Sequence, residues 1–203
     1  MASPYNLTID DPQAHFNKIL ANIRNHPPGR FTATESLYLH NSNDPAAYKH
    51  SIDGWFFENT LQNVECYYEE PLSRQYGNIG KTEWAQDSND QCVLRIVIDP
   101  IARHSYSLKQ GVAESTGLMS TVLHECVHAY LRLLFCRGVC DHKFCQIYGV
   151  QNEEMGGHGM KSIVLASELE DKVKEAWNWN VDLDISYNCQ KLEFEVNGGP
   201  IVR

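Results

Sequence analysis

Hydrophobic residues recur at helical spacing in the first sixty residues. In "DDPQAHFNKILANIR", Asp11 can cap a helix, Pro12 suits its first turn, and the prolines from Pro27 onward are expected to end it. A second helix is expected after Asp44, with Pro45 at its first position. The apolar stripe that predicts the first helix consists of Phe16, Ile19, Leu20 and Ile23.

The middle of the chain changes to patterns that are typical of strands. "VECYYEE" (64–70) alternates between two faces and predicts a half-exposed strand, and the turn-rich segment 76–91 can hold another short one. "CVLRIVID" (92–99) is a β-branched run, which predicts a well-buried strand. A late strand is expected within the C-terminal tail, in 183–199.

The longest apolar stretch, "LMSTVLHECVHAYLRLLFC" (118–136), predicts a mostly buried helix, after a loop and with Ser115 or Thr116 as its cap. A last helix is expected over 158–179. A few helices with a small sheet predict an α+β fold, and a length of 203 residues favours one domain. That domain would comprise N-terminal helices within 1–63, a motif-bearing core at about 92–177 and a tail at 178–203.

Three ionisable residues interrupt the buried helix. His124 and His128 are four residues apart, so they lie on one helix face and can bind the same ion, while Glu125 can flank it. This is the HExxH pattern of zinc peptidases, in which the metal lowers the pKa of a bound water from about 15.7 toward 7 and the glutamate acts as general base. Ionisable groups in a buried helix are costly without partners, which favours a metal over a merely structural cluster.

A catalytic zinc usually has three protein ligands and one open position. Downstream of the helix, "NEEMGGHGMKS" offers two kinds of third ligand. One is Glu153 or Glu154. The other is His158, which is favoured because the glycines around it let the backbone approach a metal closely.

The HExxH motif followed by Ala129, with Gly157-His158-Gly159 about thirty residues later at a helix start, resembles the SprT-like zinc metalloprotease family. The resemblance covers about 92–177. It implies a compact zincin-like fold, with a small β-sheet, an HExxH helix and a following helix that carries the third ligand. It further implies one catalytic zinc ion held by His124, His128 and His158, with Glu125 as the catalytic residue.

Charge and composition limit the partners. The net charge is −9, with few basic residues to neutralise phosphates, so nucleic acid is a possible partner only through the family resemblance. No signal peptide is recognised and no apolar run approaches the length of a membrane span, so an intracellular protein, cytoplasmic or nuclear, without membrane contact is expected.

Seven cysteines are present, and three of them cluster in "CRGVCDHKFC". Cys136, Cys140 and Cys145, together with His142, could hold a structural zinc, but their spacing does not match the common zinc motifs. Free thiols or a disulfide are the alternatives. Cys126, in the apolar helix, is expected to act as a small buried hydrophobic residue.

The function expected from these features is a zinc metalloendopeptidase that hydrolyses peptide bonds of protein or peptide substrates. A non-catalytic zinc domain that binds proteins is the alternative, and the intact Glu125 favours the enzyme because a binding module needs no base beside the metal. A third possibility is a DNA-associated protease that acts on DNA–protein crosslinks. His142 and Tyr148 are candidates for stabilising the oxyanion. The substrate is expected to add as a strand at a sheet edge, with the strand at 92–99 as the element concerned.

Overall fold

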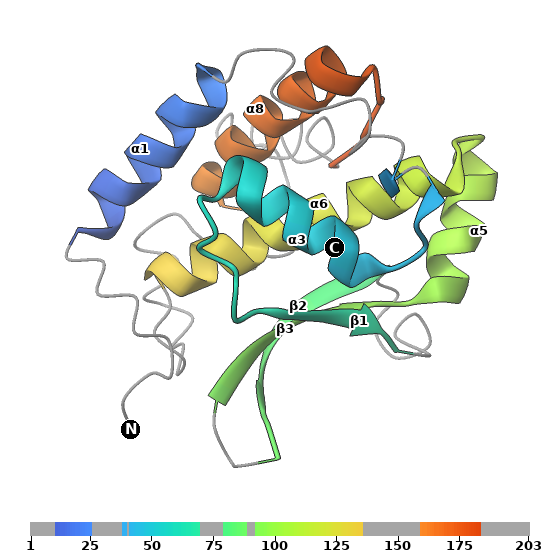
Figure 1. Ribbon diagram of the computed structural model, residues 1–203, viewed down its shortest axis with the longest axis horizontal. Coiled ribbons are helices and arrows are strands. Elements are labelled where there is room, and N and C mark those ends of the chain that lie inside the picture. The colour runs from blue at the N-terminus through green and yellow to red at the C-terminus, as the bar shows by residue number, and fades with distance from the viewer. Residues whose placement is uncertain are drawn as a thin grey trace, which may run out of the picture.

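The computed structural model describes residues 11–25, 38–39, 41–69, 79–88, 92–135 and 159–183. The described residues form a mixed α+β fold, with five helices above one face of a small sheet of three strands (Figure 1). The helices are α1 (Pro12–Arg24), α3 (Pro45–Phe56), α5 (Pro100–Gln110), α6 (Glu114–Phe135) and α8 (Met160–Trp177). The strands are β1 (Glu65–Tyr68), β2 (Gly80–Gln86) and β3 (Cys92–Ile98).

Three of the helices begin in the same way, with an aspartate cap followed by proline. The carboxylate of Asp11 accepts a hydrogen bond from the Ala14 amide at 2.9 Å, and α3 begins with Asp44 and Pro45 as the sequence predicts. The third case is α5, which was not expected. Asp99 caps it and accepts from two amides of its first turn at 2.9 Å. The prediction of a loop before the HExxH helix is therefore wrong for residues 100–110, which form α5.

The sheet has the order β1-β3-β2, so β3 lies in its centre. β3 is parallel to β1 and antiparallel to β2. The burial expected for the strand at 92–99 is confirmed, since Leu94, Ile96 and Ile98 are fully buried. A central strand has no open edge, however, so the expectation that this strand receives the substrate is wrong. Among the strands of the described residues, β1 and β2 lie at the edges, and α6 packs against β2.

The α6 helix is the centre of the hydrophobic core. It contacts both β2 and β3 on one side, and α3, α5 and α8 also pack against it (Figure 1). It begins at Glu114, so Ser115 and Thr116 lie inside its first turn and the predicted cap is wrong. The apolar positions expected to be buried are all buried, namely Leu118, Val122, Leu123, Val127, Leu131 and Leu134.

The last helix predicted from the sequence is present as α8. It begins at Met160 after Gly159 and ends before Asn178, which adopts a left-handed conformation with φ of 55°. The sequence pattern places Ile163, Ala166, Leu169, Val173 and Trp177 on one apolar stripe. The first four are buried and Trp177 is half-buried. The late strand expected in 183–199 falls outside the described residues, apart from residue 183. None of the described helices is long and apolar enough to cross a lipid bilayer.

Candidate metal centre

The two histidines of the HExxH motif face one another on α6. The Nε2 atoms of His124 and His128 are 3.1 Å apart, and the ring centroids are 4.8 Å apart. Both side chains are partly buried. The i,i+4 spacing places the rings side by side as expected, and the Nε2 atoms are the pair of nitrogens that converge.

The separation of these nitrogens fits a shared zinc ion. Two imidazole nitrogens bound at about 2.05 Å with a tetrahedral angle lie about 3.3 Å apart. The observed 3.1 Å is close to that value. The same distance also fits one N–H···N hydrogen bond between neutral rings. The distance alone therefore does not distinguish a zinc site from a hydrogen-bonded pair. The buried carboxylate favours the zinc site, because a hydrogen-bonded pair of histidines gives no reason for a buried glutamate beside it.

Glu125 is buried next to this pair, with 6% of its surface exposed. Its Oε2 accepts a hydrogen bond from the hydroxyl of Thr82 in β2 at 2.7 Å. The strand can approach so closely because residue 80 is glycine. A Cβ atom there would lie only 3.1 Å from Cγ and Oε1 of Glu125. β2 thus lies directly against Glu125, a contact that the sequence pattern does not predict.

The residues predicted as the third ligand lie beyond the part of the chain that the structure describes. His158 immediately precedes Gly159, the cap of α8, and the alternatives Glu153 and Glu154 also lie outside the described residues. Within the described ranges there is no group of three or more His, Cys, Asp or Glu side chains that could hold a metal. The donor set shown is therefore the pair His124 and His128, two imidazoles of the kind that zinc binds.

The cysteine predictions can be examined only in part. Cys126 is fully buried and free, as expected for a small hydrophobic residue, and burial raises the pKa of its thiol well above the usual value. The cluster of Cys136, Cys140, His142 and Cys145 falls outside the described residues. So does Tyr148, the other oxyanion candidate.

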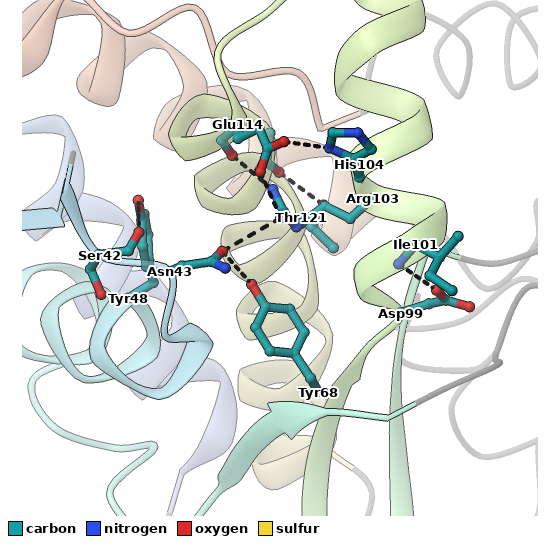
Figure 2. Close-up of polar contacts among 11 residues, drawn as sticks. Ser42, Asn43, Tyr48, Tyr68, Asp99, Ile101, Arg103, His104, Glu114 and Thr121 are labelled. Carbon is teal, nitrogen blue, oxygen red and sulfur yellow. Dashed lines mark hydrogen bonds and ion pairs between the residues drawn. The ribbon is translucent and has the colours of Figure 1, made fainter.

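A second polar cluster, which the sequence did not suggest, lies at the start of α6 (Figure 2). Arg103 of α5 is buried and donates to the backbone carbonyl of Glu114 at 3.0 Å and to its carboxylate at 3.2 Å. His104 contacts the other carboxylate oxygen of Glu114. Tyr68 and Arg103 both point toward the Oδ1 atom of Asn43 (Figure 2). These contacts fix α5, β1 and the segment before α3 to the first turn of α6.

This polar cluster lies apart from the two histidines. Glu114 precedes Glu125 by eleven residues, or about 16 Å along a helix.

Comparison of the chain with models of known protein families, with curated proteins and with solved structures found no match. The function proposed below therefore rests on the residues of the HExxH helix and their geometry.

Proposed function

We propose that this chain is a zinc-dependent endopeptidase, in which His124, His128 and His158 hold one catalytic zinc ion. The observation that carries the proposal is the pair of imidazole nitrogens 3.1 Å apart beside a buried carboxylate. The SprT-like spacing of the two motifs supports His158 as the third ligand. Zinc bound there would activate a water molecule and polarise the carbonyl of the scissile peptide bond.

In this proposal, Glu125 moves protons. Its carboxylate accepts a proton from the attacking water and then donates it to the leaving amine, as a general base that becomes a general acid. Its burial beside β2 restricts the directions that the carboxylate can take. Substrate would pair with the outer edge of β2, since this is the edge strand next to α6.

The test distinguishes loss of the general base from loss of zinc binding. Glu125→Gln preserves size and can still hydrogen-bond a water molecule, but it cannot accept the proton. We expect this variant to retain one zinc per chain and its melting temperature, and to lose roughly 100-fold or more of its peptidase activity. Glu175→Gln is the matched control, because Glu175 pairs with Lys172 on α8 and the loss of such a surface pair should leave activity unchanged.

Two outcomes would contradict the proposal. Activity of Glu125→Gln equal to that of the parent would exclude this residue as the base. A parent that binds zinc fully but cleaves no protein substrate would instead favour a non-catalytic zinc domain that binds proteins. Metal content by mass spectrometry, measured on the same samples as cleavage, separates these two results.

A further inference from the structure

The hydroxyl of Thr82 donates a hydrogen bond to the carboxylate of Glu125. Thr82 is the one buried residue of β2, with 6% of its surface exposed. Its Oγ1 atom lies 2.7 Å from Oε2 of Glu125 and 3.0 Å from the backbone carbonyl oxygen of the same residue. The strand thus presents a hydroxyl, not an apolar side chain, at its point of contact with the HExxH helix.

Thr82 is itself held from two directions. Within the sheet it lies opposite Ile96 of β3, which is fully buried. From α6, the guanidinium of Arg132 donates to the carbonyl oxygen of Thr82. Arg132 follows Glu125 by seven residues, so the two side chains lie on the same helix face two turns apart. The same face of α6 therefore contacts Thr82 twice. Glu125 accepts from the Thr82 hydroxyl, and Arg132 donates to the Thr82 carbonyl.

This contact restricts a side chain that is otherwise flexible. A glutamate has three rotatable bonds, and its carboxylate can take many directions unless a neighbour fixes it. A hydrogen bond to an ionised carboxylate is stronger than one between neutral groups, and burial strengthens it further. Proton transfer requires the carboxylate within hydrogen-bond reach of the reacting water, so its direction affects the rate of the chemical step.

We infer that Thr82 is a positioning residue for Glu125: by donating to Oε2, its hydroxyl sets the direction from which the carboxylate exchanges the proton. The inference rests on the proposed peptidase function, because it assigns Thr82 a role in that reaction. Thr82 acts through Glu125 and need not touch the substrate. Removal of its hydroxyl should therefore reduce kcat more than it changes KM.

The test compares Thr82→Val, which removes the hydroxyl at nearly constant shape, with Thr82→Ser, which keeps it. We expect Thr82→Val to bind one zinc per chain, to keep KM within about twofold and to lose roughly 10- to 100-fold in kcat, while Thr82→Ser recovers most of the loss. Thr121→Val is the matched control. The hydroxyl of Thr121 donates to the Gly117 carbonyl on the same helix at 2.9 Å, and valine keeps the methyl group that faces Gly80.

A second measurement, on metal-free protein, tests the contact without activity. Thr82→Val should lower the melting temperature by roughly 5 °C in the parent background and by less in a Glu125→Ala background, where only the backbone carbonyl of residue 125 remains to accept from the hydroxyl. Equal decreases in both backgrounds would overturn the contact. Unchanged kcat in Thr82→Val, with an active parent and an inactive Glu125→Gln, would overturn the inference alone. A zinc-loaded parent without activity would overturn the proposed function, and with it this role of Thr82.

Discussion

A single methyl group at position 80 should disturb the candidate site from the side of the sheet. In Gly80→Ala, the new Cβ would lie 3.1 Å from Cγ of Glu125 and 3.1 Å from Cγ2 of Thr121. Carbon atoms in contact prefer about 3.5 to 4.0 Å, so the neighbours must retreat by about 0.4 Å or more. Glu125 cannot swing away at no cost, because its Oε2 is hydrogen-bonded to Thr82 at 2.7 Å.

The expected losses of stability and of kcat follow from this contact distance, which is too short by about 0.4 Å. Overpacking of a core by one methyl group costs about 1 to 3 kcal/mol, while replacing glycine by alanine recovers about 0.4 to 1 kcal/mol from the unfolded chain. The net destabilisation of Gly80→Ala should be about 1 kcal/mol, or a melting temperature lower by about 3 °C for a chain of this size. A displacement of 1 Å can cost about 100-fold in rate, so a shift near 0.4 Å should cost kcat about 10-fold.

The assay measures melting temperature by circular dichroism and kcat on an unfolded protein substrate, at equal zinc occupancy. Gly54→Ala is the matched control. Gly54 is exposed within α3, and its Cβ would meet only Asn59 Oδ1 at an ordinary 3.6 Å. Alanine should therefore stabilise that helix by about 1 kcal/mol and leave kcat unchanged. If Gly80→Ala were more stable than the parent and equally active, the close approach of β2 to Glu125 would be refuted.

Three further predictions concern metal, pH and substrate. His124→Ala and His158→Ala should each lose bound zinc, together with the increase in melting temperature that zinc gives the parent; full zinc occupancy in His158→Ala would instead assign the third ligand to Glu153 or Glu154. Glu114 has a lowered pKa, mainly through its hydrogen bond to His104, so its contribution to stability is present above its usual value of 4.5 and is lost as pH falls through the lower folded value. The melting temperatures of Glu114→Gln and the parent should therefore differ at pH 7 and converge under acid conditions, and a difference that persists below the folded pKa would contradict this. Pairing along β2 through main-chain groups reads few side chains, so cleavage sites mapped by mass spectrometry should show loose sequence preference, and dominance of one residue at one subsite would argue against it.

The sequence predicted the elements whose signals are local. The caps at Asp11 and Asp44, the alternation in β1 and the apolar stripe of α8 all appear where the pattern places them. α5 was missed because its apolar residues do not form a buried stripe. Ile101 and Leu108 are 56% and 69% exposed, and the helix buries Arg103 and Ser107 instead. The Asp99-Pro100 pair is the local signal for this helix, since it repeats the Asp-Pro start of α1 and α3.

The site was predictable to the extent that it depends on spacing within one helix. His124, Glu125 and His128 share a helix, so their relative placement follows from its period. The contact of Glu125 with Thr82 depends on the pairing of β2 with β3 and on the packing of the sheet against α6, and neither can be derived from local pattern. The same holds for the identity of the edge strand, which depends on strand order. Lys81 and Glu83 in "GKTEW" are charged, as is common on edge strands, but the segment does not show which strand it pairs with or which helix packs against it.

The bond between Arg132 and Thr82 also affects how copies of this protein meet. The amide of Asp99 donates to the carbonyl of Ile79 at 2.8 Å, and the pairs of an antiparallel ladder alternate from there, so the backbone groups of Thr82 face outward from β2. On an edge strand, outward backbone groups can pair with a strand from another copy and so extend the sheet, which is a common route to aggregation. Here the guanidinium of Arg132 already donates to the carbonyl oxygen of Thr82, and β2 also carries the ion pair of Lys81 with Glu83. The HExxH helix therefore removes the Thr82 carbonyl from the backbone groups that a strand from another copy could use, and a substrate strand on this edge would pair with the other outward groups of β2.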